Sequence, residues 1–104
     1  MKKIVSYLGF AQKSNNFIKG QKALKTAEKK IFLIMVCVTA TQNLKDLAKN
    51  LKEKFKCAVI YLNTNLKELT NLNDIKIIGI TDENLANAII KEYTSNCENN
   101  NKEN

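Results

Sequence analysis

The stretch Ile31–Val38 (IFLIMVCV) is apolar at every position, and it decides the fold class. A strand with one face in water alternates apolar and polar residues, whereas a strand covered on both faces is apolar throughout. The stretch is also far shorter than the roughly 20 residues of a membrane-spanning helix. We therefore expect Ile31–Val38 to be a central strand of a sheet that carries helices on both faces.

Upstream of this strand, the spacing of apolar residues predicts two helices joined by a short extended piece. The first helix is expected over Lys3–Gln12, the edge strand over Phe17–Lys19 and the second helix over Gly20–Lys29. In the second helix, Ala23, Leu24 and Ala27 are expected to face inward.

Downstream, strand and helix patterns continue to alternate. An amphipathic stripe predicts a helix over Gln42–Lys54. Two further apolar runs indicate buried strands, and polar caps open the helices that follow them. These elements are the strand Cys57–Leu62, a short helix Asn63–Leu69 capped by Asn65, the strand Ile75–Ile80, and a helix Glu83–Tyr93 capped by Thr81 or Asp82.

The alternation predicts one α/β domain over residues 1–93, with a central sheet between two helical layers. Residues 94–104 (TSNCENNNKEN) are polar and low in complexity, so we expect a disordered tail. The start of the chain has no long apolar segment typical of a secretory signal, and we expect a cytoplasmic monomer without a membrane span.

Positive charge is concentrated in the first half of the chain. Residues 1–56 contain 13 lysines and three acids, whereas residues 57–104 contain four lysines and seven acids. All 17 basic residues are lysines, which act as point charges and suit phosphate groups better than the edges of bases. This asymmetry is typical of a nucleic-acid-binding protein.

The sequence offers little to an enzyme. It has no histidine for acid–base chemistry near neutral pH and no glycine-rich phosphate loop. Asp82 and Glu83 are explained as a helix cap and a first-turn acid. Cys37 and Cys57 lie in apolar runs and are expected to be buried thiols, while Cys97 is expected to be free. We predict no catalytic residue, no cofactor and no metal site.

Three segments resemble one protein family in their order and spacing. They are LGFAQKSNNFIKG at residues 8–20, VTATQN at residues 38–43 and IIGITDENLANAI at residues 77–89. Together they are similar to the L-seven-Ae/L-thirty-e family of kink-turn RNA-binding ribosomal proteins, in particular its bacterial YlxQ-type branch. The resemblance covers Ile4 to Tyr93. It implies an L-thirty-e-like three-layer α-β-α sandwich with a four-stranded mixed sheet.

The resemblance also implies where RNA would bind. In the family, a kink-turn docks on the start of the second helix, and an apolar loop before the last strand covers an extruded base. The residues of this chain that would contact RNA are therefore Lys13, Lys19, Gly20, Gln21, Lys22, Lys25, Thr39 and Leu72.

The family signature Gly-x-Asn-Glu-x-x-Lys is only partly present. Gly20 matches its glycine, but Lys22 stands at the asparagine position, Ala23 at the glutamate and Thr26 at the lysine. Alanine has no acceptor for a guanine edge, and lysine can donate but not accept. The residues therefore favour recognition of RNA shape and backbone over base reading. The alternative is an adaptor of the ribosome or transcription machinery that has lost specific RNA reading.

Overall fold

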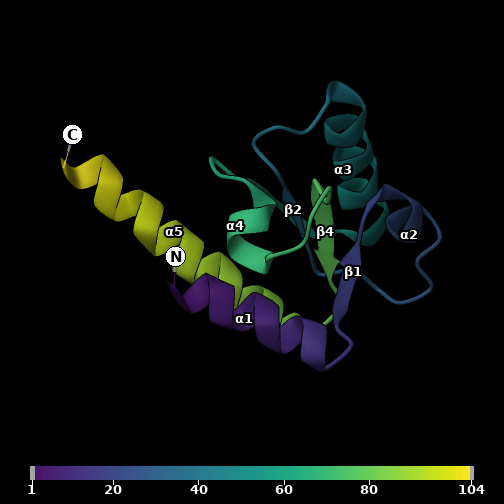
Figure 1. Cartoon of the computed structure of the whole chain (residues 1–104), viewed down its shortest axis with the longest axis horizontal. Coiled ribbons are helices and arrows are strands. Elements are labelled where there is room, and N and C mark those ends of the chain that lie inside the picture. Colours follow the sequence, from purple (N-terminus) through teal and green to yellow (C-terminus); the bar gives the residue numbers. More distant parts are fainter. Residues whose placement is uncertain (1, 104) are drawn as a thin grey trace.

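The computed structural model describes the backbone of residues 2–103 and the side chains of residues 2–95, and it places strands between two layers of helices (Figure 1). Its elements are, in chain order, α1 (Lys2–Lys13), β1 (Phe17–Lys19), α2 (Gln21–Lys25), β2 (Leu33–Val36), α3 (Gln42–Phe55), β3 (Ala58–Tyr61), α4 (Leu66–Thr70), β4 (Ile77–Ile80) and α5 (Glu83–Glu103).

The four strands form one mixed sheet in the order β1-β4-β2-β3. β2 runs parallel to β3 and antiparallel to β4, and β1 runs antiparallel to β4. The prediction of an α/β chain with a four-stranded mixed sheet is therefore confirmed, as is β1 as an edge strand.

Side chains of β2 alternate between two apolar cores, one on each face of the sheet. Leu33 and Met35 pack into the core formed with α1, α4 and α5. Ile34 and Val36 pack into the core formed with α2 and α3. This arrangement explains the apolar run over Leu33–Val36, because both faces of the strand are covered (Figure 1). The predicted strand Ile31–Val38 is too long, and Val38, which lies beyond β2, is 49% exposed.

The predicted cap Asn65 opens α4, although its side chain makes no capping hydrogen bond. α3 opens on Thr41, for which the sequence makes no cap prediction. The Thr41 hydroxyl accepts the Leu44 backbone N–H at 3.4 Å, and α3 ends at Lys56 in the left-handed conformation. The carboxylate of Asp82 accepts the Leu85 N–H at 2.9 Å, which settles the choice between Thr81 and Asp82. Each such bond satisfies a backbone donor that the first turn of a helix leaves unpaired.

The predicted second helix is wrong in length, because α2 ends at Lys25 rather than Lys29. Leu24 is its only buried residue, so no apolar stripe supports further turns. Thr26 ends the helix by donating its hydroxyl to the Lys22 carbonyl at 3.1 Å. Ala23, predicted to face inward, is exposed, whereas Ala27 is half-buried against the core.

Two other predictions need correction. β3 is an edge strand rather than a buried one: Ile60 packs into the core, whereas Tyr61 is 53% exposed. The last helix is longer than the predicted Glu83–Tyr93, because the backbone of α5 is helical to Glu103. Cys97 lies outside the residues whose side chains are described. No helix in the described part of the chain is both long and apolar enough to cross a membrane.

Candidate nucleic-acid interface

The chain turns from β1 into α2 at Gly20, which has φ 87° and ψ 156°. Side chains other than hydrogen are strained in this region of backbone space. A Cβ placed on Gly20 would lie 4.0 Å from Ile75, so the restriction is conformational and not steric. The Gly20 N–H donates to the Ile77 carbonyl at 2.9 Å and ties the entrance of α2 to the chain leading through β4.

α2 packs closely on the sheet at Leu24. Leu24 is 1% exposed, and it packs over Gly79 of β4. A Cβ on Gly79 would approach Leu24 Cδ2 to 2.7 Å, closer than two carbon atoms can come. The glycine therefore lets a five-residue helix with one buried side chain lie flat on the sheet.

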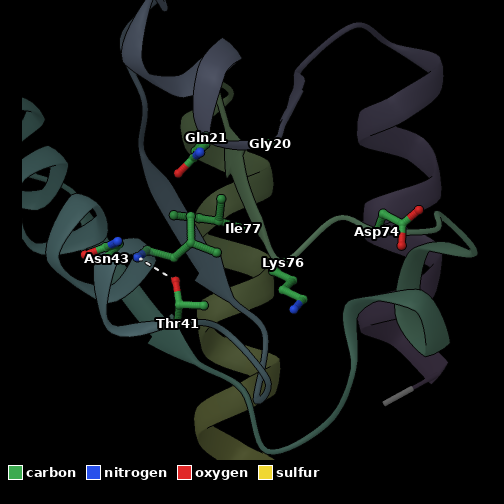
Figure 2. Close-up of a pocket in the computed structure, with 8 residues that line it drawn as sticks. Gly20, Gln21, Thr41, Asn43, Asp74, Lys76 and Ile77 are labelled. Carbon is green, nitrogen blue, oxygen red and sulfur yellow. Dashed lines mark hydrogen bonds between the residues drawn. The ribbon is translucent and has the colours of Figure 1, made fainter.

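A hollow of about 350 Å³ opens beside the entrance of α2 (Figure 2). We call it the amide hollow, since the side chains of Gln21 and Asn43 lie on its rim. It is lined by Gly20, Gln21, Thr41, Asn43, Leu44, Asp74, Lys76 and Ile77. Figure 2 shows Gln21, Asn43 and Thr41 around Ile77, while Lys76 and Asp74 lie on the other side. The hollow thus offers two apolar side chains, two amides, the ammonium group of Lys76 and the carboxylate of Asp74.

A second hollow of about 280 Å³ adjoins the first, and we call it the loop hollow. It is lined by Cys37, Thr39, Asn65, Leu66, Lys67, Glu68, Leu72, Asp74, Ile75 and Lys76. Asp74 and Lys76 line both hollows, so the two are neighbours, and we call the pair the depression. Elements far apart in the sequence meet there: the entrance of α2, the start of α3, the loop after α4 and the chain entering β4.

The structure brings together half of the residues predicted to contact RNA. Gly20 and Gln21 line the amide hollow, and Thr39 and Leu72 line the loop hollow. Lys19 lines a different hollow of about 590 Å³, together with Ala23. The other three lysines are exposed and line neither of the two neighbouring hollows; they are Lys13, Lys22 and Lys25.

Sequence reasoning missed Lys76, one of the two residues shared by the hollows. Lys76 was assigned only to the strand Ile75–Ile80, yet it lines both hollows. Its signal was a single charge at the start of an otherwise apolar run. Three further residues, Thr41, Asn43 and Asp74, were also missed. They come together because the strand order places the start of α3 beside the loop before β4, and the sequence alone does not show that order. The five-residue α2 also supplies a weaker helix dipole than the predicted ten-residue helix.

Cys37 lies at the base of the loop hollow and is held by hydrogen bonds. Its Sγ lies 3.2 Å from the Thr39 hydroxyl and donates to Asn65 Oδ1 at 3.4 Å. Burial raises the pKa of the thiol, but hydrogen bonds from Thr39 and the Leu66 backbone, with the charge of Lys76, outweigh burial and bring the pKa below its ordinary value. For Cys57, burial dominates and raises the pKa. Both thiols are free and buried, as predicted.

These opposite shifts predict opposite effects of pH on stability. The folded state lowers the pKa of Cys37 from its unfolded value of 9.0. This thiol therefore stabilises the fold at a pH above 9.0, and the stabilisation is lost as the pH falls through the folded pKa. Cys57 has a raised pKa, so its contribution is lost as pH rises. Urea unfolding between pH 7 and 10 should show that Cys37→Ala becomes more destabilising as pH rises. Cys57→Ala should become less destabilising over the same range. Parallel pH profiles would contradict this assignment.

Comparisons with known proteins establish the fold alone. No protein-family model matches the chain, and no curated protein matches its sequence. Among solved structures, a protein of unknown function from Bacillus halodurans superposes with a TM-score of 0.71. The match covers 86% of this chain and 94% of the other, at 17% sequence identity. The chain thus shares its α/β architecture with that protein.

Proposed function

We propose that this chain is a non-enzymatic, cytoplasmic RNA-binding protein of the L-seven-Ae/L-thirty-e type, which recognises structured RNA through the two neighbouring hollows. The observation that carries the proposal is the depression itself. It combines the Gly20 backbone and two amide side chains with two lysines, Lys67 and Lys76, and two acids, Glu68 and Asp74, and it receives segments from four parts of the chain. The excess of lysine in the first half of the sequence supports a polyanionic partner.

The side chains around the amide hollow suit the edge of an unpaired base. An amide group presents one donor and one acceptor, the pattern that pairs with adenine. Gln21 and Asn43 offer two such groups beside the half-buried Leu44, while Ile77 beneath them is 1% exposed. Their carbonyl oxygens are acceptors, which Ala23, at the signature glutamate position, cannot supply. Ala23 is also exposed and lines another hollow. Structured RNA exposes base edges at loops and bulges, so an internal loop is the expected target.

The proposal is tested by measuring binding of the chain to a kink-turn RNA and to a plain duplex of equal length, across a salt series. We expect the kink-turn to bind more tightly and to keep its advantage at moderate salt, because base and shape contacts are less salt-dependent than phosphate contacts. Equal, salt-labile binding would reject recognition through the hollows. Absence of binding at low salt, with partners captured from a lysate that survive nuclease treatment, would favour the protein adaptor instead.

Lys76 provides a second test, since it is the ammonium group shared by both hollows. We expect Lys76→Gln to weaken kink-turn binding roughly tenfold, within the 1–3 kcal/mol typical of a charge-assisted hydrogen bond. The matched control is Lys91→Gln, which removes one exposed lysine from α5 that lines neither hollow. Equal losses in the two variants would mean that only net charge matters.

A further inference from the structure

The outer side of β3 carries backbone groups that point away from the rest of the sheet. Among the strands that the structure describes, β3 ends the order β1-β4-β2-β3 and is paired with β2 alone. The Leu62 N–H donates to the Val36 carbonyl at 2.9 Å, so residues 58, 60 and 62 direct their backbone groups to β2. Successive residues of a strand direct these groups to opposite sides, so those of Val59 and Tyr61 point outward. We call this outward side of Val59 and Tyr61 the β3 edge.

The β3 edge is accessible to another chain. The Tyr61 side chain is 53% exposed, and Val59 is half-buried. The Tyr93 hydroxyl of α5 donates to the Tyr61 carbonyl at 3.3 Å, as expected for a carbonyl that points away from β2. Within the described part of the chain, this leaves two N–H donors and the Val59 carbonyl for an incoming strand.

Three lysines of α3 lie on the flank that faces the β3 edge. Lys45, Lys49 and Lys52 each follow a residue packed in the core by one position, and a helix turns by about 100° per residue, so they share one flank. Asn43 lies on the other flank, where it lines the amide hollow beside Ile77 of β4. Because β4 and β3 lie on opposite sides of β2, the three lysines lie toward β3. We call them the lysine row.

A hollow of about 480 Å³ connects the lysine row to β3. It is lined by Lys49, Lys52, Glu53, Lys56 and Cys57. Cys57 directly precedes β3, and its N–H donates to the Lys52 carbonyl at 3.3 Å, so the end of α3 is tied to the start of the strand. Three ammonium groups outnumber the one carboxylate. The space beside the β3 edge is therefore positively charged.

The spacing of the lysine row suits the side chains of an extended chain. Side chains on one face of a strand recur about every 6.6 Å, at 3.3 Å per residue. Successive lysines of the row are separated by about 4.5–6 Å along the helix axis, at 1.5 Å per residue. A strand paired with the β3 edge would therefore bring alternate side chains close to successive ammonium groups.

We infer that the β3 edge binds an extended acidic segment of a partner protein, which adds a strand to the sheet beside the lysine row. Backbone hydrogen bonds with Val59 and Tyr61 would hold the segment, and the lysines would select carboxylates at alternate positions. The inference goes beyond RNA recognition and does not depend on it, because the depression lies toward the other flank of α3.

The chemistry of the edge favours this occupant over two others. Phosphate groups of RNA only accept hydrogen bonds, whereas the edge presents the Val59 carbonyl as well as N–H donors, the pairing pattern of a peptide. A second copy of the chain, paired antiparallel at β3, would bring two lysine rows together. Like charges beside an edge oppose such pairing.

The probe is a fluorescent peptide of about ten residues that alternates glutamate with threonine, titrated with the full chain. We expect it to bind roughly tenfold more tightly than the same peptide with glutamine for glutamate, because several exposed ion pairs act together. Its affinity should fall as salt rises.

Backbone methylation of the peptide tests strand addition directly. Two versions carry N-methyl groups on alternate residues, one on the odd and one on the even positions. Only alternate N–H groups of an added strand face its neighbour, so one version should lose binding and the other should bind within about twofold of the parent. Equal behaviour of the two versions would overturn the proposal.

Lysine variants assign the charge preference to the row. Lys49→Gln with Lys52→Gln should weaken binding of the glutamate peptide roughly fivefold, whereas the same two changes to arginine should not. The matched control is Lys2→Gln with Lys91→Gln, which removes the same charge from α1 and α5 on the other face of the sheet and should bind as the wild type does. Equal losses in the glutamine pair and the control would show that only net charge matters.

Tyr61→Pro removes one outward N–H but keeps the pairing of β3 with β2, since proline is tolerated where an edge strand faces solvent. It should weaken peptide binding more than Tyr61→Thr, which keeps the N–H. If Tyr61→Pro proves unstable to urea, the methylated peptides give the same test on the wild type.

Two further results would overturn the proposal. Displacement of the peptide by single-stranded oligouridylate, with equal effects of the two methylation patterns, would assign the row to polyanions in general. A dimer of the wild type in sedimentation that is lost in Tyr61→Pro would assign the edge to a second copy. None of these outcomes bears on the proposed function, because kink-turn binding is measured without the peptide.

Discussion

Replacing Gly79 by valine is expected to lower the free energy of unfolding by about 1–3 kcal/mol, the usual range for forcing extra atoms into a packed core. The β-carbon alone would lie 2.7 Å from Leu24 Cδ2 and 3.4 Å from Ile31 Cγ2. Both neighbours are buried and have little room to move. Valine favours strands, so the loss would come from packing and not from backbone preference. Urea unfolding measures the change directly.

The same substitution should also weaken binding to the kink-turn RNA, although Gly79 lines neither hollow. Displacing Leu24 shifts α2, and α2 carries Gln21 at its first position. Adding Leu24→Ala to Gly79→Val would make room, so the two changes together should destabilise by less than their sum. Strict additivity would show that Leu24 does not sit on Gly79.

Gly9 supplies the matched control for this experiment. It lies within α1, and a Cβ there would meet nothing within 4 Å. Glycine in the middle of a helix destabilises it by roughly 0.5–1 kcal/mol relative to alanine. Gly9→Ala should therefore raise the free energy of unfolding by about that amount, opposite in sign to Gly79→Val.

The periodic parts of the fold could be predicted from the sequence because one physical cause dominates each of them. β2 is covered on both faces, and its stretch is apolar throughout. The apolar stripe of α3 and the cap at Asp82 are equally local signals. Prediction was wrong where the outcome depends on distant residues. α2 is short because Leu24 is its only buried residue. β3 is an edge strand because of its place in the strand order.

The candidate site was predictable only in part for the same reason. Gly20 could be identified from the sequence, because a glycine between an extended piece and a helix indicates an unusual backbone conformation. The lysines near it were grouped by sequence distance, yet Lys19 lines a hollow on another side of α2. Lys76 and Asn43 reach the depression through the pairing of β4 with β2, which no local pattern encodes.

Replacing Gly20 by alanine is expected to lower the free energy of unfolding by about 1–3 kcal/mol, since φ 87° with ψ 156° is open essentially to glycine. To relieve the strain, the chain would have to turn Gly20 away from Ile77 and give up the 2.9 Å hydrogen bond between them. This bond holds Gln21 and Ile77 in their places in the lining of the amide hollow. Kink-turn affinity should therefore fall by more than tenfold. Urea unfolding and RNA titration of the same sample measure both effects.

Gln21→Ala separates the backbone at the α2 entrance from the side chain next to it. This variant keeps the Gly20 conformation and removes one amide from the hollow, so stability should stay within about 0.5 kcal/mol of the wild type, as for most exposed positions. Its kink-turn affinity should fall less than that of Gly20→Ala, because Asn43 and Lys76 remain in place. A Gly20→Ala variant that unfolds at the wild-type urea concentration would show that residue 20 does not adopt positive φ in solution. A loss of affinity confined to Gln21→Ala would assign recognition to the amide, and the Gly20 backbone would then serve only to turn the chain into α2.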